Sequence, residues 1–430
     1  MGRTRSLGMQ GCQGSMERTT SAQPVDERER IRALDALRGG ALLGILMVNM
    51  AAFKGLSTLE QFPRPESLRA TTDQIAYFVI QAFFTGKFYP IFALLFGLGF
   101  ALQIQRLEAR GIAPTTIMLR RLIVLLIIGA LHGLFIWTGD VLFGYALCGL
   151  ILLAVRGLSP NALLTAVLVL WGLQFVCCLS CAGVAIWAAQ LGEFQQESSS
   201  DLFAAYVEQA RQAYAQPNYW QAQRFRFTEW ALMQVNMLLL MPNILMMFLL
   251  GLYFGKVGLF GQLEEHRRLL LWLTFGALPL GLAINAYGGY GMLEAARTGD
   301  EWRSLGWMLV LLPLGAVLSL GYVGLFGLSW SALAGLQRVL VPVAHAGQMA
   351  LTNYLMQSVV CTLLFYGYGL GLYGRGGIAQ GMGLTVLIWL LQVGFSVLWL
   401  SRFQYGPMEW LWRSLTYGQR LPLRRPVRAA

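Results

Sequence analysis

The sequence predicts an all-α integral membrane bundle of about ten transmembrane helices, with both termini in the cytoplasm. Composition, hydropathy and charge distribution together predict this class. Of the 430 residues, 56% are hydrophobic and only 12% are charged, which argues against a soluble protein. Apolar windows of about 20 residues recur along the chain, and each can cross a ~30 Å hydrocarbon core as a helix. Lipid offers the backbone no hydrogen-bond partners, so the crossing segments are expected to be helical.

The basic residues orient these crossings. The chain segments expected on the side of the two termini carry 22 of the 32 Lys and Arg residues, whereas the opposite connections carry nine and Lys87 lies within a span. The positive-inside rule therefore places both termini in the cytoplasm of a multi-pass inner-membrane protein. The net charge of +11 follows this distribution, so the expected partner is the lipid bilayer and no nucleic acid. The crossings are expected at 33–53, 74–105, 118–137, 140–155, 161–190, 229–255, 269–288, 304–332, 342–368 and 381–401.

Three segments flank or interrupt the bundle, which is expected over residues 31–401. Residues 1–30 are polar and lack periodicity, which predicts a disordered cytoplasmic tail. Residues 191–228 form an external loop, which is expected to be amphipathic and helical; it either covers the outer mouth of the bundle or is a solvated connection. Residues 402–430 are a basic cytoplasmic tail, expected to lie against anionic lipid.

The first span carries a charge pair, Asp35 and Arg38, which argues against a cleaved signal peptide. The two residues are three apart and share one helix face, so they can pair where either charge alone would be costly. The pair is either an anchor on the cytoplasmic side or a site at which Arg38 meets a phosphate or carboxylate. Asn49 lies about three turns further on and can bond to a substrate inside the bundle.

The second span is too long for one straight crossing, and Gly86, Lys87 and Pro90 interrupt it. A broken or kinked helix is therefore expected there. Lys87 has two interpretations. Its side chain either extends to the membrane surface, or contacts an anionic substrate group or Asp140.

The segment from Gly129 to Asp140 contains the strongest catalytic candidates, His132 and Asp140. A tight turn at Trp137 to Gly139 separates them, so they are expected on two helices near the outer face. Ionisable residues at membrane depth are costly and mark functional sites by default. A carboxylate can orient a histidine for general-base work, although a hydrogen-bonded structural histidine is the alternative. The scattered histidines and cysteines have no metal-ligand spacing, and no metal site is predicted.

Five motifs resemble those of the YeiB-like family of bacterial membrane proteins, which is classed by a domain of unknown function. They run from Leu34 to Gly39, Gly86 to Gly97, Leu131 to Asp140, Met349 to Ser358 and Phe403 to Arg413. The resemblance covers about residues 28–425. Asn353 and Gln357, in the fourth motif, are further substrate-binding candidates.

The first motif is also similar, more distantly, to the opening of transmembrane acyltransferases such as heparan-alpha-glucosaminide N-acetyltransferase. That resemblance implies an enzyme that moves an acyl group from cytoplasmic acyl-CoA to a glycan or lipid acceptor across the membrane. No bound cofactor is implied, since acyl-CoA is a co-substrate. His132 and Asp140 are then the catalytic candidates, while Asp35, Arg38 and Lys87 are binding candidates.

A function of another class stays open, namely a transporter or binding protein for a small anionic or amphipathic solute. His132 would then relay protons along a path lined by the same charged residues. The absence of a clear inverted repeat favours the enzyme. The oligomeric state, including a homo-oligomer, is left open by the sequence.

Overall fold

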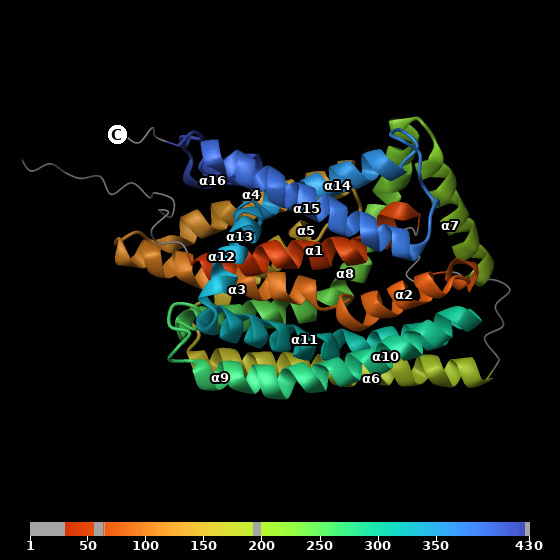
Figure 1. Ribbon diagram of the computed structural model, residues 1–430, viewed down its shortest axis with the longest axis horizontal. Coiled ribbons are helices and arrows are strands. Elements are labelled where there is room, and N and C mark those ends of the chain that lie inside the picture. The colour runs from red at the N-terminus through yellow and green to blue at the C-terminus, as the bar shows by residue number, and fades with distance from the viewer. Residues whose placement is uncertain (1–30, 56–62, 64, 192–198, 426–430) are drawn as a thin grey trace, which may run out of the picture.

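The protein is a bundle of helices that run mostly along one long axis (Figure 1). The computed structural model describes residues 31–55, 63, 65–191 and 199–425, so the predicted tail at 1–30 lies outside the described residues. Within the described part there is no strand, only one isolated bridge between Phe403 and Arg424. The predicted all-α class is confirmed.

The helices follow one another in antiparallel crossings. We call the two ends of the bundle the Arg32 end and the Lys54 end, after the first and last residues of α1. The elements are α1 (Arg32–Lys54), η2 (Pro65–Leu68), α2 (Thr71–Phe83), α3 (Phe88–Ala109), α4 (Pro114–Phe135), α5 (Leu142–Val155), α6 (Pro160–Leu191), α7 (Ser199–Ala215), α8 (Tyr219–Lys256), α9 (Arg267–Trp272), η3 (Leu273–Ala277), α10 (Leu278–Thr298), α11 (Glu301–Ala332), α12 (Ala334–Val339), α13 (Val341–Gln348), α14 (Ala350–Phe365), α15 (Ile378–Arg402) and α16 (Pro407–Tyr417).

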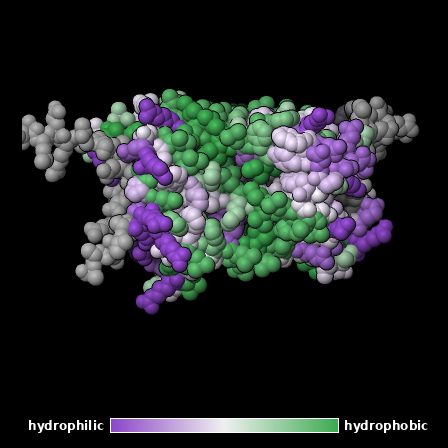
Figure 2. Space-filling model, turned by 90° about the horizontal axis from the view of Figure 1, so that it is seen from above, coloured by the Kyte–Doolittle hydropathy of each residue, from purple (hydrophilic) through white to green (hydrophobic). Residues whose placement is uncertain are grey.

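Eight helical segments of the described chain are long and apolar enough to cross a membrane. Two shorter apolar helices, α5 and α14, lie within the other two expected crossings. The molecular surface agrees with this assignment, because a broad hydrophobic band lies between two hydrophilic ends (Figure 2). The protein is therefore a multi-pass membrane protein.

The second crossing is broken, as the sequence predicts. Helix α2 ends at Phe83 and α3 begins at Phe88, so residues 84–87 form a turn inside the crossing. Gly86 has φ +77° in this turn, a left-handed conformation that other residues adopt at a cost. The break places backbone carbonyls and side chains of the turn inside the bundle.

Helix α5 is too short to cross a bilayer by itself. Its 14 residues span about 21 Å, against the ~30 Å of a hydrocarbon core. At the Arg32 end, Arg156 follows α5 and donates a 2.9 Å hydrogen bond to Thr115 at the start of α4. Since α5 ends beside the start of α4 at the Arg32 end, the length by which it falls short of the hydrocarbon core lies at the Lys54 end. The turn before α5, which carries Asp140, consequently lies below the surface of the bundle.

The centre of the bundle is the contact between α3 and α8, which depends on glycine. A side chain at Gly97 would collide with the Phe248 carbonyl, and one at Gly251 would collide with the Leu94 carbonyl. The two helices therefore approach at backbone distance, as small residues allow in membrane bundles. This contact fixes the position of α8, which forms part of the wall of the cavity described below.

Helix α7 covers part of the Lys54 end, where Figure 1 shows it across the ends of the crossing helices. It falls in the segment 191–228 that the sequence predicts to be helical. Its Tyr214 stacks on Tyr366, with ring centroids 4.5 Å apart. The following helix, α8, begins at Tyr219, ten residues before the crossing predicted at 229.

Candidate functional site

The structure brings His132 and Asp140 into direct contact. His132 lies in the last turn of α4, and its Nδ1 is 2.7 Å from Oδ1 of Asp140. Both side chains are 1% exposed. The turn between them is held by the amide N–H groups of Ile136 and Trp137, which both donate to the His132 carbonyl. Eight residues of sequence thus fold into a closed pair below the bundle surface.

Asp140 also lies two residues before the next helix, α5. Its second oxygen, Oδ2, accepts a 2.8 Å hydrogen bond from the amide of Phe143 in the first turn of α5. A carboxylate at a helix N-terminus is stabilised by free amides and by the helix dipole. Helices α4 and α5 meet closely here, because a side chain at Gly129 would collide with the Phe143 backbone. The position of Asp140 is therefore fixed from two sides.

The other nitrogen of His132 is unused. Nε2 is buried and has no hydrogen-bond partner among the described residues. If Nδ1 carries the proton shared with Asp140, Nε2 has a free lone pair and can accept a proton. Two aromatic side chains enclose the pair. The Tyr354 ring lies 5.3 Å from the imidazole and its hydroxyl accepts from the Val141 amide, while Trp230 packs against Gly133.

A second buried carboxylate, Glu229 of the neighbouring helix α8, fixes the same turn through a hydrogen bond. Its Oε2 accepts a 3.0 Å hydrogen bond from Thr138, which precedes Asp140 by two residues, and another from the hydroxyl of Tyr214 in α7. Glu229 is 1% exposed. Burial, together with the Glu229 carboxylate, raises the pKa of Tyr214 well above its ordinary value, so the phenol stays protonated and donates.

The C-terminal end of α4 is satisfied by side chains of α8. Arg226 and Tyr219 both donate to the Phe135 carbonyl, at 3.0 and 2.8 Å, and Gln223 donates to the Leu134 carbonyl at 2.5 Å. These carbonyls have no partner within their own helix, so donors from another element are needed. Three residues of α8 therefore fix the helix end that carries His132.

A cavity of about 870 Å³ lies beside the pair. It extends from residues at the Lys54 end, including Lys54 and Asp73, to Gly44 at mid-length of α1. Asp140 and its turn residues line this cavity, whereas His132 is not part of the lining. The volume lies within the range of small-molecule sites. The carboxylate thus faces the cavity and the imidazole stands behind it.

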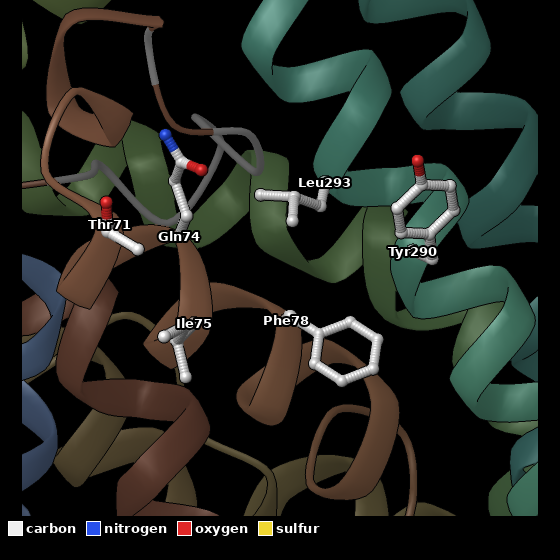
Figure 3. A pocket seen from close by; sticks show the side chains of 6 residues that line it. All are labelled: Thr71, Gln74, Ile75, Phe78, Tyr290 and Leu293. Carbon is white, nitrogen blue, oxygen red and sulfur yellow. The ribbon is translucent and has the colours of Figure 1, made fainter.

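A second, smaller pocket of about 240 Å³ lies between α2 and α10 (Figure 3). Its lining carries no charged side chain, and Ile75 and Tyr290 at its rim are more than half exposed. It lies away from the His132–Asp140 pair. We therefore regard the larger cavity as the candidate site.

The remaining predicted site residues are spread through the bundle. Asn49 lines the cavity. Lys87 is 0% exposed, so an extension of its side chain to the membrane surface is wrong. Its Nζ instead donates a 2.8 Å hydrogen bond to the carbonyl of Gln81 in the last turn of α2. A cation is stabilised at that position by the carbonyl end of the helix, and Lys87 makes no described contact with Asp140.

The charge pair of α1 lies at the opposite end of the bundle. Arg38 is 3.0 Å from Asp35, which confirms the predicted contact, and it also donates to the Leu95 carbonyl at 3.3 Å. Eleven residues of helix separate Arg38 from Asn49, about 16 Å along the axis. The structure therefore does not bring Asp35 and Arg38 to the His132–Asp140 pair.

Asn353 and Gln357 join helices. Asn353 donates to Ser396 of α15 and to the Ala346 carbonyl, and Gln357 donates to Gln392 of α15 and to the Leu42 carbonyl. Neither side chain lines the cavity. Their amides hold α14 against α15 and α1, which differs from the expected contact with substrate.

Comparison with known proteins gives the family. The family model described as "Protein of unknown function (DUF418)" matches residues 254–419. The chain is 32% identical over 415 residues to the uncharacterized protein YxaH of Bacillus subtilis (strain 168), covering 93% of this chain and 97% of that protein. It is 32% identical over 408 residues to the uncharacterized protein YeiB of Escherichia coli (strain K12), covering 90% and 96%. The chain belongs to the DUF418 family.

The predicted membership of this DUF418 protein in the YeiB-like family is confirmed. No solved structure matches the chain. Both relatives are described as uncharacterized. Within the described residues, no group of three or more His, Cys, Asp and Glu side chains could hold a metal ion.

Glu229 is the functional candidate that the sequence analysis overlooked. It is the only acidic residue between Tyr219 and Lys256, a signal that was available. The predicted crossing began at residue 229, which placed the carboxylate at the membrane surface. Because α8 begins ten residues earlier, Glu229 lies in its third turn and is buried.

Proposed function

We propose that this protein is a membrane-embedded acyltransferase that uses the His132–Asp140 pair to deprotonate an acceptor. One observation carries the proposal, namely a buried imidazole–carboxylate contact of 2.7 Å whose carboxylate lines a large cavity. A carboxylate that shares a proton with a neighbouring imidazole can serve with it as a general base. The distant resemblance of the first helix to transmembrane acyltransferases adds support.

The reaction requires a group that takes the proton of the acceptor hydroxyl and holds it until the thiolate leaves. The acceptor hydroxyl attacks the thioester carbonyl of the acyl donor, the new C–O bond forms, and the C–S bond breaks. The pair takes the hydroxyl proton and returns it to the leaving thiolate, so it ends unchanged. Asp140 lines the cavity, so it receives the acceptor, while His132 behind it shares the proton through Nδ1.

The charge distribution supports a direction for the two substrates. If the basic Arg32 end lies in the cytoplasm of an inner-membrane protein, the cavity extends from the outer side. The glycan or lipid acceptor then enters past Lys54 and Asp73. Acyl-CoA approaches from the Arg32 end, where Arg38 is the candidate for a phosphate contact.

A transporter or solute-binding protein is the second candidate, and one observation favours it. Asp140 lines the cavity whereas His132 does not, so the pair resembles a carboxylate that binds a solute and exchanges a proton with the imidazole behind it. In that case the protein moves an amphipathic solute and does not turn over acyl-CoA.

The test uses the purified full chain in nanodiscs, with radiolabelled acyl-CoA and an extract of envelope lipids and glycans. We expect label in the extract and release of CoA, with both lost in His132→Gln. His266→Gln is the matched control, because the side chain of His266 is hydrogen-bonded to the Val257 carbonyl near the Arg32 end, away from the pair. Unaltered acyl transfer by His132→Gln would show that the His132–Asp140 pair is not the general base. No CoA release by the wild-type protein, together with solute uptake into vesicles, would favour the second candidate.

A further inference from the structure

One group of polar residues in the cavity lining comes from α2, the break and α3. Tyr77, Gln81, Thr85 and Tyr89 line it at intervals of four residues along α2, the break and the start of α3. Tyr77 and Gln81 share one face of α2 because they are four residues apart, whereas Thr85 lies in the break and Tyr89 in the first turn of α3. We call these four lining residues the row. This row is formed by neutral side chains.

Part of this row lacks hydrogen-bond partners. Oγ1 of Thr85 and the hydroxyl oxygen of Tyr89 are buried, and neither has a partner among the described residues. Buried polar atoms in folded proteins are nearly always hydrogen-bonded, and leaving them unpaired costs free energy. Hydroxyl groups both donate and accept. The occupant of the cavity is therefore expected to bring hydroxyl groups of its own.

Another part of the cavity is apolar and adaptable. Met47 of α1, Met233 and Met237 of α8 and Met308 of α11 belong to its lining. Methionine is flexible and fits apolar groups of irregular shape. These side chains suit a hydrocarbon chain better than a second sugar ring.

Two charges at the mouth are already engaged. Nζ of Lys54 donates to the carbonyls of Gly376 and Gly377, and Oδ1 of Asp73 accepts from the Ala379 amide at 2.8 Å. Lys54 therefore binds the loop that precedes α15, and Asp73 binds the first turn of α15. Glu66 of η2 and Arg211 of α7 also belong to the lining, and Asp140 is engaged by His132 and by the Phe143 amide. The lining from Gln81 to Tyr89 carries no charged side chain.

We infer that the cavity takes an amphipathic ligand with an uncharged, hydroxyl-rich head and an apolar chain, the chemistry of a neutral glycolipid. The head meets the row from Gln81 to Tyr89, and the chain lies among the methionines. The inference rests on the proposed function, in which this ligand is the acceptor and the hydroxyl that reaches Asp140 is acylated.

The test measures binding without any acyl donor. The full chain in phosphatidylcholine nanodiscs is dialysed against radiolabelled octyl glucoside below its micelle concentration, with glucose and octanol as separate probes and empty nanodiscs as blank. We expect octyl glucoside to bind at least about tenfold more tightly than either probe. Thr85→Val should weaken binding about five- to tenfold, since one buried hydrogen bond is lost.

Thr274→Val is the matched control. Thr274 is also buried, but it donates to the Leu270 carbonyl and does not line the cavity. If Thr85→Val fails to fold, Gln81→Met gives the same test. Equal binding of octanol, equal binding of glucose, no binding at all, or full binding by the Thr85 or Gln81 variant would each overturn the inference. Octyl glucoside binding without any acyl transfer would instead contradict only the proposed function.

Discussion

Thr138 donates a 3.0 Å hydrogen bond to Glu229 across 91 residues of sequence. The bond ties the turn that carries Asp140 to α8, and the hydroxyl of Tyr214 donates to the same carboxylate oxygen. Glu229 therefore supports the site without contacting the cavity-facing carboxylate in the described structure.

We predict that Glu229→Ala destabilises the protein by about 2–4 kcal/mol, because it leaves two buried hydroxyl donors without their acceptor. The measurement is the thermal unfolding of the detergent-solubilised protein. Glu208→Ala in α7 is the control, since Glu208 is exposed and contacts only Gln212 in the described structure; a change within about 0.5 kcal/mol is expected there. Equal stability of both variants would show that the Thr138 bond does not hold the turn.

The sidedness of the bundle gives the second prediction. The excess of Lys and Arg on one side predicts the Arg32 end in the cytoplasm. Ala215 ends α7 at the Lys54 end, and Tyr417 ends α16, which packs on the start of α4 through a 2.8 Å bond from Trp412 to the Arg121 carbonyl. Reporter fusions after Ala215 should be external and those after Tyr417 cytoplasmic. The reverse pattern would invert every direction proposed for the substrates.

The third prediction is that Asp35 and Arg38 act as a unit. Their contact is 3.0 Å, and the side chains are 6% and 26% exposed. Removing one partner of a deeply buried ion pair costs about 3–5 kcal/mol, and less for a partly exposed pair such as this one. Single Ala variants should lower the folded yield, measured by size-exclusion chromatography, more than the double variant does. Additive losses would show that the two residues do not interact.

The fourth prediction concerns Lys87. It distinguishes a lysine that stabilises the broken helix from one that binds substrate. Lys87→Met keeps the length of the side chain and removes the charge, and an apolar replacement of a buried charge is often neutral or stabilising. We therefore expect a folded yield within about twofold of the wild type. Lys87→Ala leaves a cavity and should cost about 2–4 kcal/mol. If Lys87→Met folds normally but loses ligand binding, the lysine contacts substrate, which is one of the interpretations that the sequence allows.

The architecture could be read from the sequence because its causes are local. Length and apolarity give each crossing, and Gly86 and Pro90 mark the break between α2 and α3. The contact between His132 and Asp140 was also local, since a tight turn joins the two helices. Each of these features depends on residues close in the chain.

What could not be read are the contacts between distant helices. The sequence does not show that Asn353 meets Ser396, or that Lys87 finds the Gln81 carbonyl. From the sequence, Asn353 is a substrate-binding candidate, and Lys87 either extends to the membrane surface or contacts a substrate group or Asp140. In the structure, a neighbouring helix or the end of α2 supplies the partner of each side chain.

The last prediction concerns His132 and Asp140. Asp140→Asn keeps an acceptor for the Phe143 amide, and His132→Gln keeps hydrogen-bonding capacity, so both variants should fold with a yield near that of the wild type. Neither new side chain can exchange a proton at accessible pH. If the pair works as a general base, each variant should lose about 10²–10⁴-fold in acyl transfer.

The double variant decides whether the two residues act together. If the two residues share one proton site, either single substitution already removes the function of that site. The double variant should therefore be no slower than the slower single variant. The rates are measured as CoA release under single-turnover conditions, with the folded fraction of each sample determined separately. Losses that multiply would show two independent roles. Full activity in His132→Gln would reduce the histidine to a hydrogen-bonded partner that holds the Asp140 carboxylate at the start of α5.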